Sequence, residues 1–369
     1  MPRMQRPAIL AVLTALLLVV APAAQAATKP RAPKGFFGVM WDRAALRGGA
    51  EHQEAQWALM GRSGVESARL VFSWAAMQPT PTGPDDYSRM DQRVAAAARH
   101  GIRVLPVVLY TPDWARRYPD RQASPPEHPS DYAAFMARLV QRYGPGGTFW
   151  AEHPELHALP IRHWQIWNEP NFDFYWYTPE QGGWAHEYAE LLRQAKLAIR
   201  TEDPGAQIVL AGLADASWRV LSRAYGGGIR GAFDVASINI FTGRPGFVMA
   251  AVRLNRRVLK AHHEPRKPIW VTETTFPAAK GQVPPPDEGW QRRWYTTPRG
   301  MARRLTELYA LGVKNARRFR LQRIYWYTWA SRYSGFSDLF DYSGLIRVWP
   351  DGTAQPQPAL RAFRRSARR

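Results

Sequence analysis

Short apolar segments of strand length alternate with longer segments of helical periodicity along most of the chain. The longer segments repeat apolar residues at the spacing of a helical turn, as at Tyr132, Phe135, Met136 and Leu139. Alternation of this kind is typical of βα units around a parallel sheet. Eight strands are predicted, at residues 35–41, 67–72, 103–109, 163–167, 207–211, 235–241, 268–272 and 323–329.

Eight βα units predict one α/β domain folded as a (β/α)8 TIM barrel. No Gly-rich phosphate turn follows the first strand, which disfavours a doubly wound sheet. Long loops follow the third, fourth and seventh strands, at 113–129, 171–180 and 276–297. Because active sites of such barrels lie at the carboxyl ends of the strands, we expect these enlarged loops to surround the site.

The amino terminus is typical of an export signal. Arg3 and Arg6 precede an apolar run at 8–21, and Ala24-Gln25-Ala26 offers a cleavage site of small residues. The run is shorter than the roughly 20 residues of a spanning helix, and later apolar runs are shorter still. We therefore expect a signal peptide at 1–27, a barrel domain at 28–369 without a transmembrane segment, and a secreted or cell-envelope location.

The charge of the chain is strongly positive, because 50 Lys and Arg residues face 30 Asp and Glu residues, giving a formal net charge of +20. The arginines are scattered and do not form a nucleic-acid-binding pattern, so no nucleic-acid partner is expected. The densest cluster, at 361–369, is explained either by a solvated helix end or by adhesion to an anionic cell-envelope surface. There are no cysteines, which excludes disulfides and thiolate chemistry.

Two carboxylates end predicted strands on either side of the barrel. Glu169 lies in WQIWNEPN after the fourth strand, and Glu273 lies in PIWVTETTF at the seventh. Burial beside tryptophans raises the pKa of at least one member of such a pair. Hydrolysis of a glycosidic bond needs one carboxylic acid to protonate the leaving oxygen and one carboxylate to attack or to activate water, and their separation decides between retention and inversion.

Other reaction types have weaker support. The nine histidines give no HxH at the first strand and no HExxH, and His262 and His263 end a predicted helix away from the strand ends. The serine nucleophile motif GxSxG is also absent. We expect no catalytic metal and no cofactor.

At these carboxylates the chain resembles the clan A glycoside hydrolases, most closely the family 39 type and related bacterial exopolysaccharide hydrolases. The resemblance covers nearly the whole mature chain, through ARLVFSWAAMQPTPTG, LPVVLYTPDWA, WQIWNEPN, PIWVTETTFPA and YWYTWAS. It implies that Glu169 is the acid/base and Glu273 the nucleophile of a retaining double displacement. It also implies that Asn168 bonds the sugar, that Arg69 orients Glu273, and that Trp329 forms an aromatic floor.

The sixth strand departs from the family pattern, because SINIFTG places Asn239 and Phe241 where relatives often have a His-Pro-Tyr segment. Tyr110 is a candidate to replace the missing hydroxyl. Trp41 and Trp176 lie near strand ends and are candidates to line a glycan cleft, although a structural role is as compatible with each. We count Asn239, Tyr110, Trp41 and Trp176 among the predicted substrate-binding residues.

The sequence thus predicts a secreted retaining glycoside hydrolase that acts on an extracellular or cell-envelope polysaccharide. Two alternatives remain open at this point. One is a glycan-binding barrel with little or no turnover, suggested by the altered sixth strand. The other is a transglycosylase that passes the same intermediate to a sugar acceptor.

Overall fold

A computed structural model describes residues 31–180, 182–284, 291–333 and 339–368. Residues 31–369 form one compact unit. The predicted signal peptide at 1–27 lies outside the described residues, so it stays a prediction. Among the described residues, every helix is too short or too polar to cross a bilayer.

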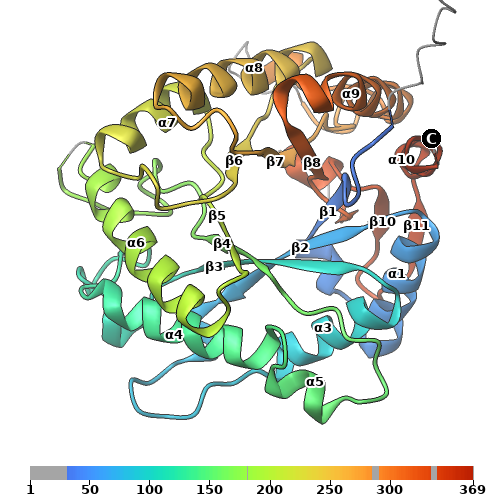
Figure 1. Cartoon of the computed structure of the whole chain (residues 1–369). Coiled ribbons are helices and arrows are strands. Elements are labelled where there is room, and N and C mark those ends of the chain that lie inside the picture. Colours follow the sequence, from blue (N-terminus) through green and yellow to red (C-terminus); the bar gives the residue numbers. More distant parts are fainter. Residues whose placement is uncertain (1–30, 181, 285–290, 334–338, 369) are drawn as a thin grey trace, which may run out of the picture. The chain divides into compact units, whose positions relative to one another are not determined.

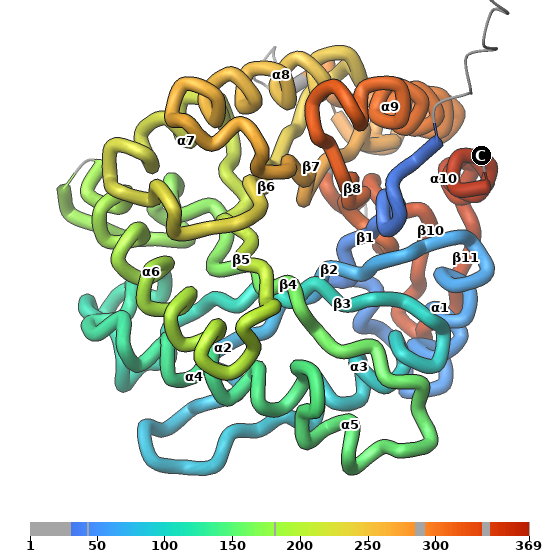
Figure 2. Tube along the Cα trace, in the orientation of Figure 1, coloured from blue at the N-terminus to red at the C-terminus, as the bar shows by residue number. Residues whose placement is uncertain are grey.

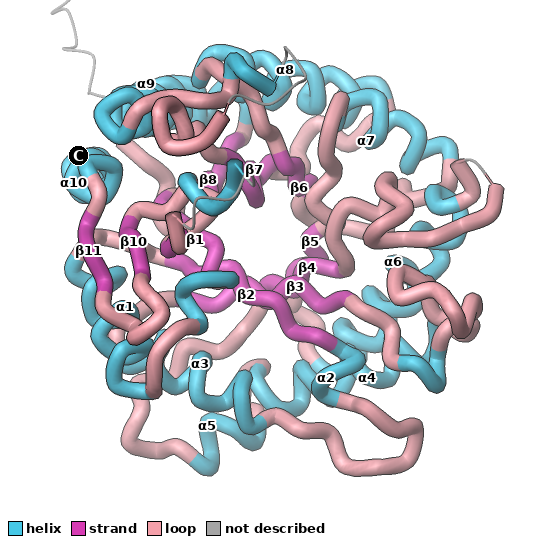
Figure 3. Tube along the Cα trace, turned by 180° about the vertical axis from the view of Figure 1, so that it is seen from behind, coloured by secondary structure: helices cyan, strands magenta, loops and turns pink. Residues whose placement is uncertain are grey.

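Eight parallel strands form the predicted barrel (Figure 1), in the order β5-β4-β3-β2-β1-β8-β7-β6. Isolated bridges between Val209 and Val235 and between Leu213 and Ile238 join the two end strands and close the ring. Figure 3 shows the strands around the centre with helices outside them. The strands are β1 (Phe37–Trp41), β2 (Ser67–Ser73), β3 (Arg103–Leu109), β4 (His163–Ile166), β5 (Gln207–Val209), β6 (Ala236–Asn239), β7 (Ile269–Thr274) and β8 (Leu321–Trp326). The predicted fold class is therefore confirmed.

The helices between the strands bury the apolar stripes seen in the sequence. In α4, for example, Tyr132, Phe135, Met136 and Leu139 are all buried. Longer helices are α1 (Ala50–Arg62), α3 (Ser88–Arg99), α4 (Pro129–Tyr143), α6 (Trp184–Glu202), α7 (Ser217–Gly226), α8 (Pro245–Ala261), α9 (Pro298–Phe319) and α10 (Pro358–Ala367). Short helical segments are α2 (Trp74–Met77), α5 (Thr148–Glu152), η1 (Arg43–Leu46), η2 (Asp113–Ala115), η3 (Gln291–Arg293) and η4 (Leu339–Tyr342).

The chain after β8 forms structure that the sequence pattern does not reveal. A small sheet of β9 (Ala330–Ser331), β10 (Ile346–Val348) and β11 (Ala354–Pro356) lies beside η1. Helix α10 then packs against α9, as Figure 2 shows near the carboxyl terminus. Strands of two or three residues are too short to carry a periodic signal, which explains why they were not predicted.

Candidate active site

The two predicted catalytic glutamates lie at the carboxyl ends of the strands, inside the rim of the barrel. Glu169 follows β4 and is 7% exposed, and Glu273 belongs to β7 and is 8% exposed. Trp167 and Glu169 both adopt a left-handed backbone, with φ of 67° and 42°. This conformation is unfavourable for residues other than glycine and is found most often at functional sites. A hydrogen bond from the Glu169 N–H to the Gly212 carbonyl, of 3.2 Å, holds this turn.

Arg69 connects three of the site residues from β2, and it is almost completely buried. Its Nη1 lies 2.6 Å from Glu273 Oε1, and its Nη2 donates to Asn168 Oδ1 at 2.8 Å. Its Nε donates to Gln165 Oε1 at 2.8 Å. The guanidinium is thus fixed from three sides, and Glu273 is held in a buried ion pair. The sequence analysis did not single out Gln165. Its position among the apolar residues Trp164, Ile166 and Trp167 could have indicated a polar side chain that faces the inside of the barrel.

Asn239 at the end of β6 contacts the other glutamate. Its Nδ2 donates to Glu169 Oε1 at 2.7 Å, and its Oδ1 accepts from Thr272 Oγ1 at 2.7 Å. The amide thus presents its N–H end to Glu169 and its oxygen to Thr272. A Cβ on Gly212 would lie 2.5 Å from the Asn239 side chain, so glycine there makes room for the amide. Sequence reasoning missed both supporting residues.

The surroundings push the two carboxyl groups toward different protonation states. Burial, and then the charge of Glu273, raise the pKa of Glu169 to about 8, although the bond from Asn239 partly opposes this. Burial also raises the pKa of Glu273, and Asp42 adds to the effect, but the ion pair with Arg69 favours its charged form. Arg69 makes its ion pair with Glu273 and has only a smaller charge effect on Glu169, so Arg69 favours the ionised form of Glu273 more than that of Glu169.

The three predicted sugar-binding tryptophans are buried in the protein. Trp41 stacks on Trp57 of α1 with ring centroids 4.3 Å apart, and Trp176 donates its indole N–H to Glu187 of α6. Trp329 has no exposed surface. These three rings have almost no exposed surface, so none of them lies open on a cleft in this structure, and their predicted contact with a sugar stays a prediction.

A different aromatic residue, Tyr327, contacts the end of the strand that carries Glu273. Tyr327 follows β8, its backbone N–H donates to the Thr274 carbonyl at 2.9 Å, and its hydroxyl donates to Asp42 Oδ2 at 3.2 Å. Its ring lies 5.9 Å from that of Phe241, which follows β6. The sequence analysis had treated Phe241 only as a departure from the family pattern.

A cavity of about 570 Å³ lies among the segments that follow β2, β3 and β4, and neither glutamate is among its lining residues. Ser73, Tyr110, Arg116, Phe174 and Tyr175 are among its lining residues. The charges of Glu273 and Glu169 contribute to raising the pKa of the Tyr175 hydroxyl, after burial, which places Tyr175 near both carboxylates. Tyr110 is 38% exposed at the end of β3. The predicted residue Tyr110 therefore lines this cavity, whereas the contact to a catalytic glutamate comes from Asn239.

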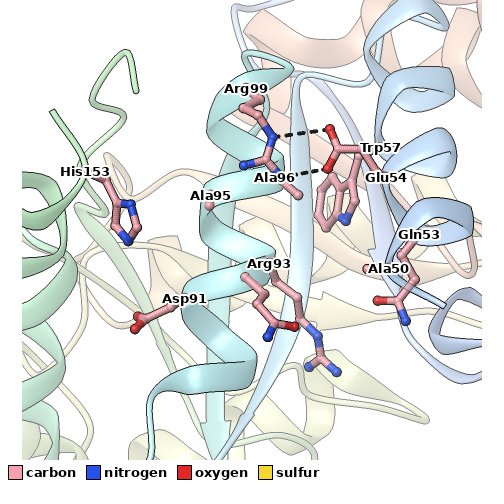
Figure 4. A pocket seen from close by; sticks show the side chains of 11 residues that line it. Ala50, Gln53, Glu54, Trp57, Asp91, Arg93, Ala95, Ala96, Arg99 and His153 are labelled. Atoms are coloured by element: carbon pink, nitrogen blue, oxygen red, sulfur yellow. Dashed lines mark hydrogen bonds and ion pairs between the residues drawn. The ribbon is translucent and has the colours of Figure 1, made fainter. Parts of the chain in front are cut away.

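A second cavity, of about 340 Å³, lies on the helical wall of the barrel between α1 and α3 (Figure 4). Glu54 projects from α1 and pairs with Arg99 and His100 at 2.7 Å each. Neither glutamate of the active site lines this cavity. Within the described ranges, no three His, Asp or Glu side chains are grouped as metal ligands.

The fold is similar to that of known glycosidases. A family 39 glycoside hydrolase from the gut symbiont Bacteroides cellulosilyticus WH2 has a TM-score of 0.64 and 16% identity, with 91% of this chain and 64% of that chain covered. The GH39 enzyme from Xanthomonas axonopodis pv. citri has a TM-score of 0.62 and 16% identity, with 91% and 67% covered. A GH39 β-xylosidase from Caulobacter crescentus has a TM-score of 0.59 and 18% identity, with 91% and 72% covered.

These likenesses concern structure and not close relationship in sequence. No protein-family model matches the chain, and no curated protein matches it in sequence. The chain spans 64% of the length of the Bacteroides enzyme. Even so, the strand order of this chain is that of the barrel predicted from its sequence, and the solved structures with a similar fold are glycosidases. The chain has the fold of the family 39 glycoside hydrolases.

Proposed function

We propose that the protein is a glycoside hydrolase that cleaves a polysaccharide by a retaining double displacement. The observation that carries this proposal is the unequal pair of glutamates: Glu273 is ion-paired with Arg69, whereas Glu169 is buried, makes no ion pair among the described residues and has a pKa raised to about 8. Acid catalysis needs the protonated carboxyl, and nucleophilic attack needs the ionised one. The pair supplies both at the same pH.

In the first step, Glu169 gives its proton to the glycosidic oxygen as the bond from that oxygen to the anomeric carbon breaks. A Glu273 oxygen forms a bond to the same carbon, giving a glycosyl-enzyme and releasing the leaving alcohol. In the second step, Glu169 takes a proton from water, whose oxygen displaces Glu273. Asn168 accepts from Arg69 through Oδ1, so its amide N–H groups are oriented to donate to a sugar hydroxyl.

Retention, as opposed to inversion, is supported by the position of Asn239. Its amide bonds Glu169 directly and also stabilises the charge of Glu273. The two carboxylates are therefore close to a single small group, which favours the shorter separation of about 5–5.5 Å typical of retaining enzymes. The β-xylosidase and exo-β-1,4-mannosidase among the similar folds are consistent with a carbohydrate substrate for this chain.

The test is product analysis by mass spectrometry on a panel of bacterial and plant polysaccharides, with the anomer of the first product followed by NMR. Wild-type protein should release oligosaccharides with retained configuration, and Glu273→Gln should lose about three orders of magnitude or more in rate, since the covalent path is removed. Glu155→Gln is the matched control and should keep full activity, because Glu155 is an exposed carboxylate in the loop that precedes β4.

Equal product release by wild type and Glu273→Gln would refute the proposal. Binding of glycans without any product would instead support the alternative of a non-catalytic glycan-binding barrel. Products larger than the donor would identify a transglycosylase.

We also propose that the protein is exported. The support is the sequence pattern of Arg3, Arg6, the apolar run at 8–21 and the small residues that follow it. Amino-terminal sequencing of protein recovered from the culture medium or cell envelope should find a mature chain beginning near residue 28. Recovery of full-length chain from the cytoplasm alone would contradict export.

A further inference from the structure

A third cavity, of about 620 Å³, lies where β6 leads into α8. Thr242, Gly243 and Arg244 line it from the loop after β6, and Phe247 lines it from the first turn of α8. Its other side is formed by Arg293, Trp294 and Arg304, which come from the segment before α9 and from α9 itself. The labels β6, α8 and α9 locate this part of the barrel in Figure 1.

The charge of this cavity is positive and is not balanced from within. Three arginines line it, and no lining residue in the described part of the chain is acidic. Arg244 and Arg293 are exposed, and neither makes an ion pair or a side-chain hydrogen bond among the described residues. Arg304 donates to the Trp294 carbonyl at 3.0 Å. In the described part of the chain, three guanidinium groups thus line one cavity and no carboxylate does.

The pKa of Arg304 shows the effect of the neighbouring positive charges. Burial, followed by the charges of Arg303 and Arg244, lowers the pKa of its guanidinium, and Glu307 opposes this only as a smaller contribution. Repulsion of this kind costs free energy in the free protein, and an anion in the cavity would relieve it.

The cavity is next to the catalytic centre. Thr242 follows Asn239 by three residues, so their Cα atoms are at most about 11 Å apart. The intervening Ile240 donates its N–H to the Glu273 carbonyl at 2.8 Å. The ring of Phe241 lies 5.9 Å from Tyr327 on the catalytic side and 6.1 Å from Trp294 on the cavity side. The rings of Tyr327, Phe241 and Trp294 therefore form a row from the end of β8 to the cavity.

The two loops that carry the arginines are packed tightly together. A Cβ on Gly243 would lie 2.3 Å from the Arg293 carbonyl oxygen, so the backbones meet at a distance that only glycine allows. Arg293 takes part in this contact directly, and Arg244 is the residue after Gly243. Their backbones are consequently fixed before any ligand arrives, which reduces the entropy lost on binding.

We propose that this cavity is a subsite for an acidic sugar residue of the glycan, with Arg244 and Arg293 binding its anionic group. Guanidinium groups pair with carboxylates through two parallel hydrogen bonds. A uronic acid fits this chemistry, as does a sugar with a sulfate ester. The assignment rests on the proposed function, because it takes the bound polymer to be the substrate cleaved at Glu169 and Glu273.

The test measures binding by calorimetry to short oligouronides, to the same oligosaccharides after reduction of the carboxyl groups, and to their sulfated derivatives. Wild-type protein should bind an anionic form at least about tenfold more tightly than the neutral form, since each charge-assisted pair contributes a factor of this size. Stronger binding of the oligouronide would identify carboxylate as the source, and stronger binding of the sulfated derivative would identify sulfate.

The double substitution Arg244→Gln with Arg293→Gln should remove most of this preference for the anionic form. The matched control is Arg253→Gln with Arg257→Gln, which removes the same charge from exposed positions of α8 outside the cavity lining. Loss of the preference in both double variants would show a general effect of net charge and would overturn the proposal. Equal affinity of wild type for charged and neutral forms, or no binding of any form, would also overturn it.

Failure of the subsite and failure of the proposed function give different results. If the subsite is wrong and the function right, wild-type protein cleaves glycans in a manner that depends on Glu273, without any preference for acidic ones. If the function is wrong and the subsite right, the binding preference persists while no Glu273-dependent product appears.

Discussion

Glu169 and Glu273 are the same residue type, and their immediate hydrogen-bond partners give them different properties. Arg69 brings a full positive charge to Glu273, and Asn239 brings only a neutral donor to Glu169. In a buried site a cation stabilises a carboxylate far more than an amide does, and the charge of Glu273 further disfavours ionisation of Glu169. In the proposed mechanism, these two neighbouring side chains decide which glutamate acts as the acid and which as the nucleophile.

The first prediction concerns the pH dependence of activity. The rate should fall as pH rises through about 8, because Glu169 loses the proton that it must donate. The bond from Asn239 favours the ionised form of Glu169, so Asn239→Ala should move this alkaline limb of kcat/KM to higher pH while lowering the maximum rate. Profiles of both proteins on one aryl glycoside measure the shift. An alkaline limb at the same pH in both would contradict the role given to Asn239.

The second prediction concerns stability. The pKa of Glu169 is higher in the folded protein than in the unfolded chain, so the unfolded state binds fewer protons between about pH 4.5 and 8. The contribution of Glu169 to stability is therefore fully present at low pH and is lost as pH rises through about 8. At pH 9 the free energy of unfolding of Glu169→Gln should exceed that of wild type by on the order of a few kcal/mol, so the variant should melt at a higher temperature, and this difference should vanish near pH 4.

Calorimetric melting of both proteins at the two pH values tests the second prediction. Asp351→Asn serves as the control. Asp351 is fully exposed and its pKa is lowered, so this variant should not gain stability over wild type at high pH. A difference between wild type and Glu169→Gln that is the same at both pH values would contradict it.

At the scale of elements, the end of β6 decides the geometry of the acid/base. The pairing register between β6 and β7 shifts between Ile238 and Asn239, which brings Asn239 opposite Glu273. The loop after β5 approaches closely enough that Gly212 touches the Asn239 side chain. The position of the Asn239 amide thus depends on Gly212, which belongs to the preceding βα unit and has no side chain.

The third prediction follows from this contact. In Gly212→Ala the new methyl group displaces the Asn239 amide from Glu169, and a displacement of about 1 Å in a catalytic site can cost roughly a hundredfold in rate. We therefore expect kcat/KM to fall by about tenfold to a hundredfold in a protein that still folds. Gly226→Ala is the control, because a Cβ there meets nothing within 4 Å and should leave activity unchanged. Unchanged activity in Gly212→Ala would show that Asn239 has room to move.

The sequence predicted elements with strong periodicity and failed where partners come from distant segments. Strand positions and the ends that carry Glu169 and Glu273 follow from apolar runs, which are local. Whether Trp329 faces a sugar or the core depends on what packs over its two faces, and this is not a local property. The contacts of Thr272 and Gly212 with Asn239 are not local either, because they form only when β6 lies between β5 and β7 in the folded barrel.

At the scale of the whole molecule, the last helix of the chain packs against the first strand. Phe363 of α10 is fully buried, with its ring 6.0 Å from Phe37 of β1 and 5.5 Å from Tyr309 of α9. Arg364 adds a hydrogen bond of 2.9 Å to the Ser63 hydroxyl beyond α1. Closing the barrel brings β1 and β8 together, and α10 then covers the region where the two ends of the fold meet.

The fourth prediction tests this packing. Phe363→Ala should lower the free energy of unfolding by about 3–5 kcal/mol, because it removes a buried ring and leaves a cavity between β1 and α9. Arg365→Ala changes the neighbouring but exposed face of α10 and should alter stability by less than about 0.5 kcal/mol. Urea unfolding followed by tryptophan fluorescence measures both. Since α10 lies outside the active site, Phe363→Ala should keep wild-type kcat/KM at a temperature where it is folded. A small loss of stability in Phe363→Ala, equal to that of Arg365→Ala, would mean that the barrel closes without help from its last helix.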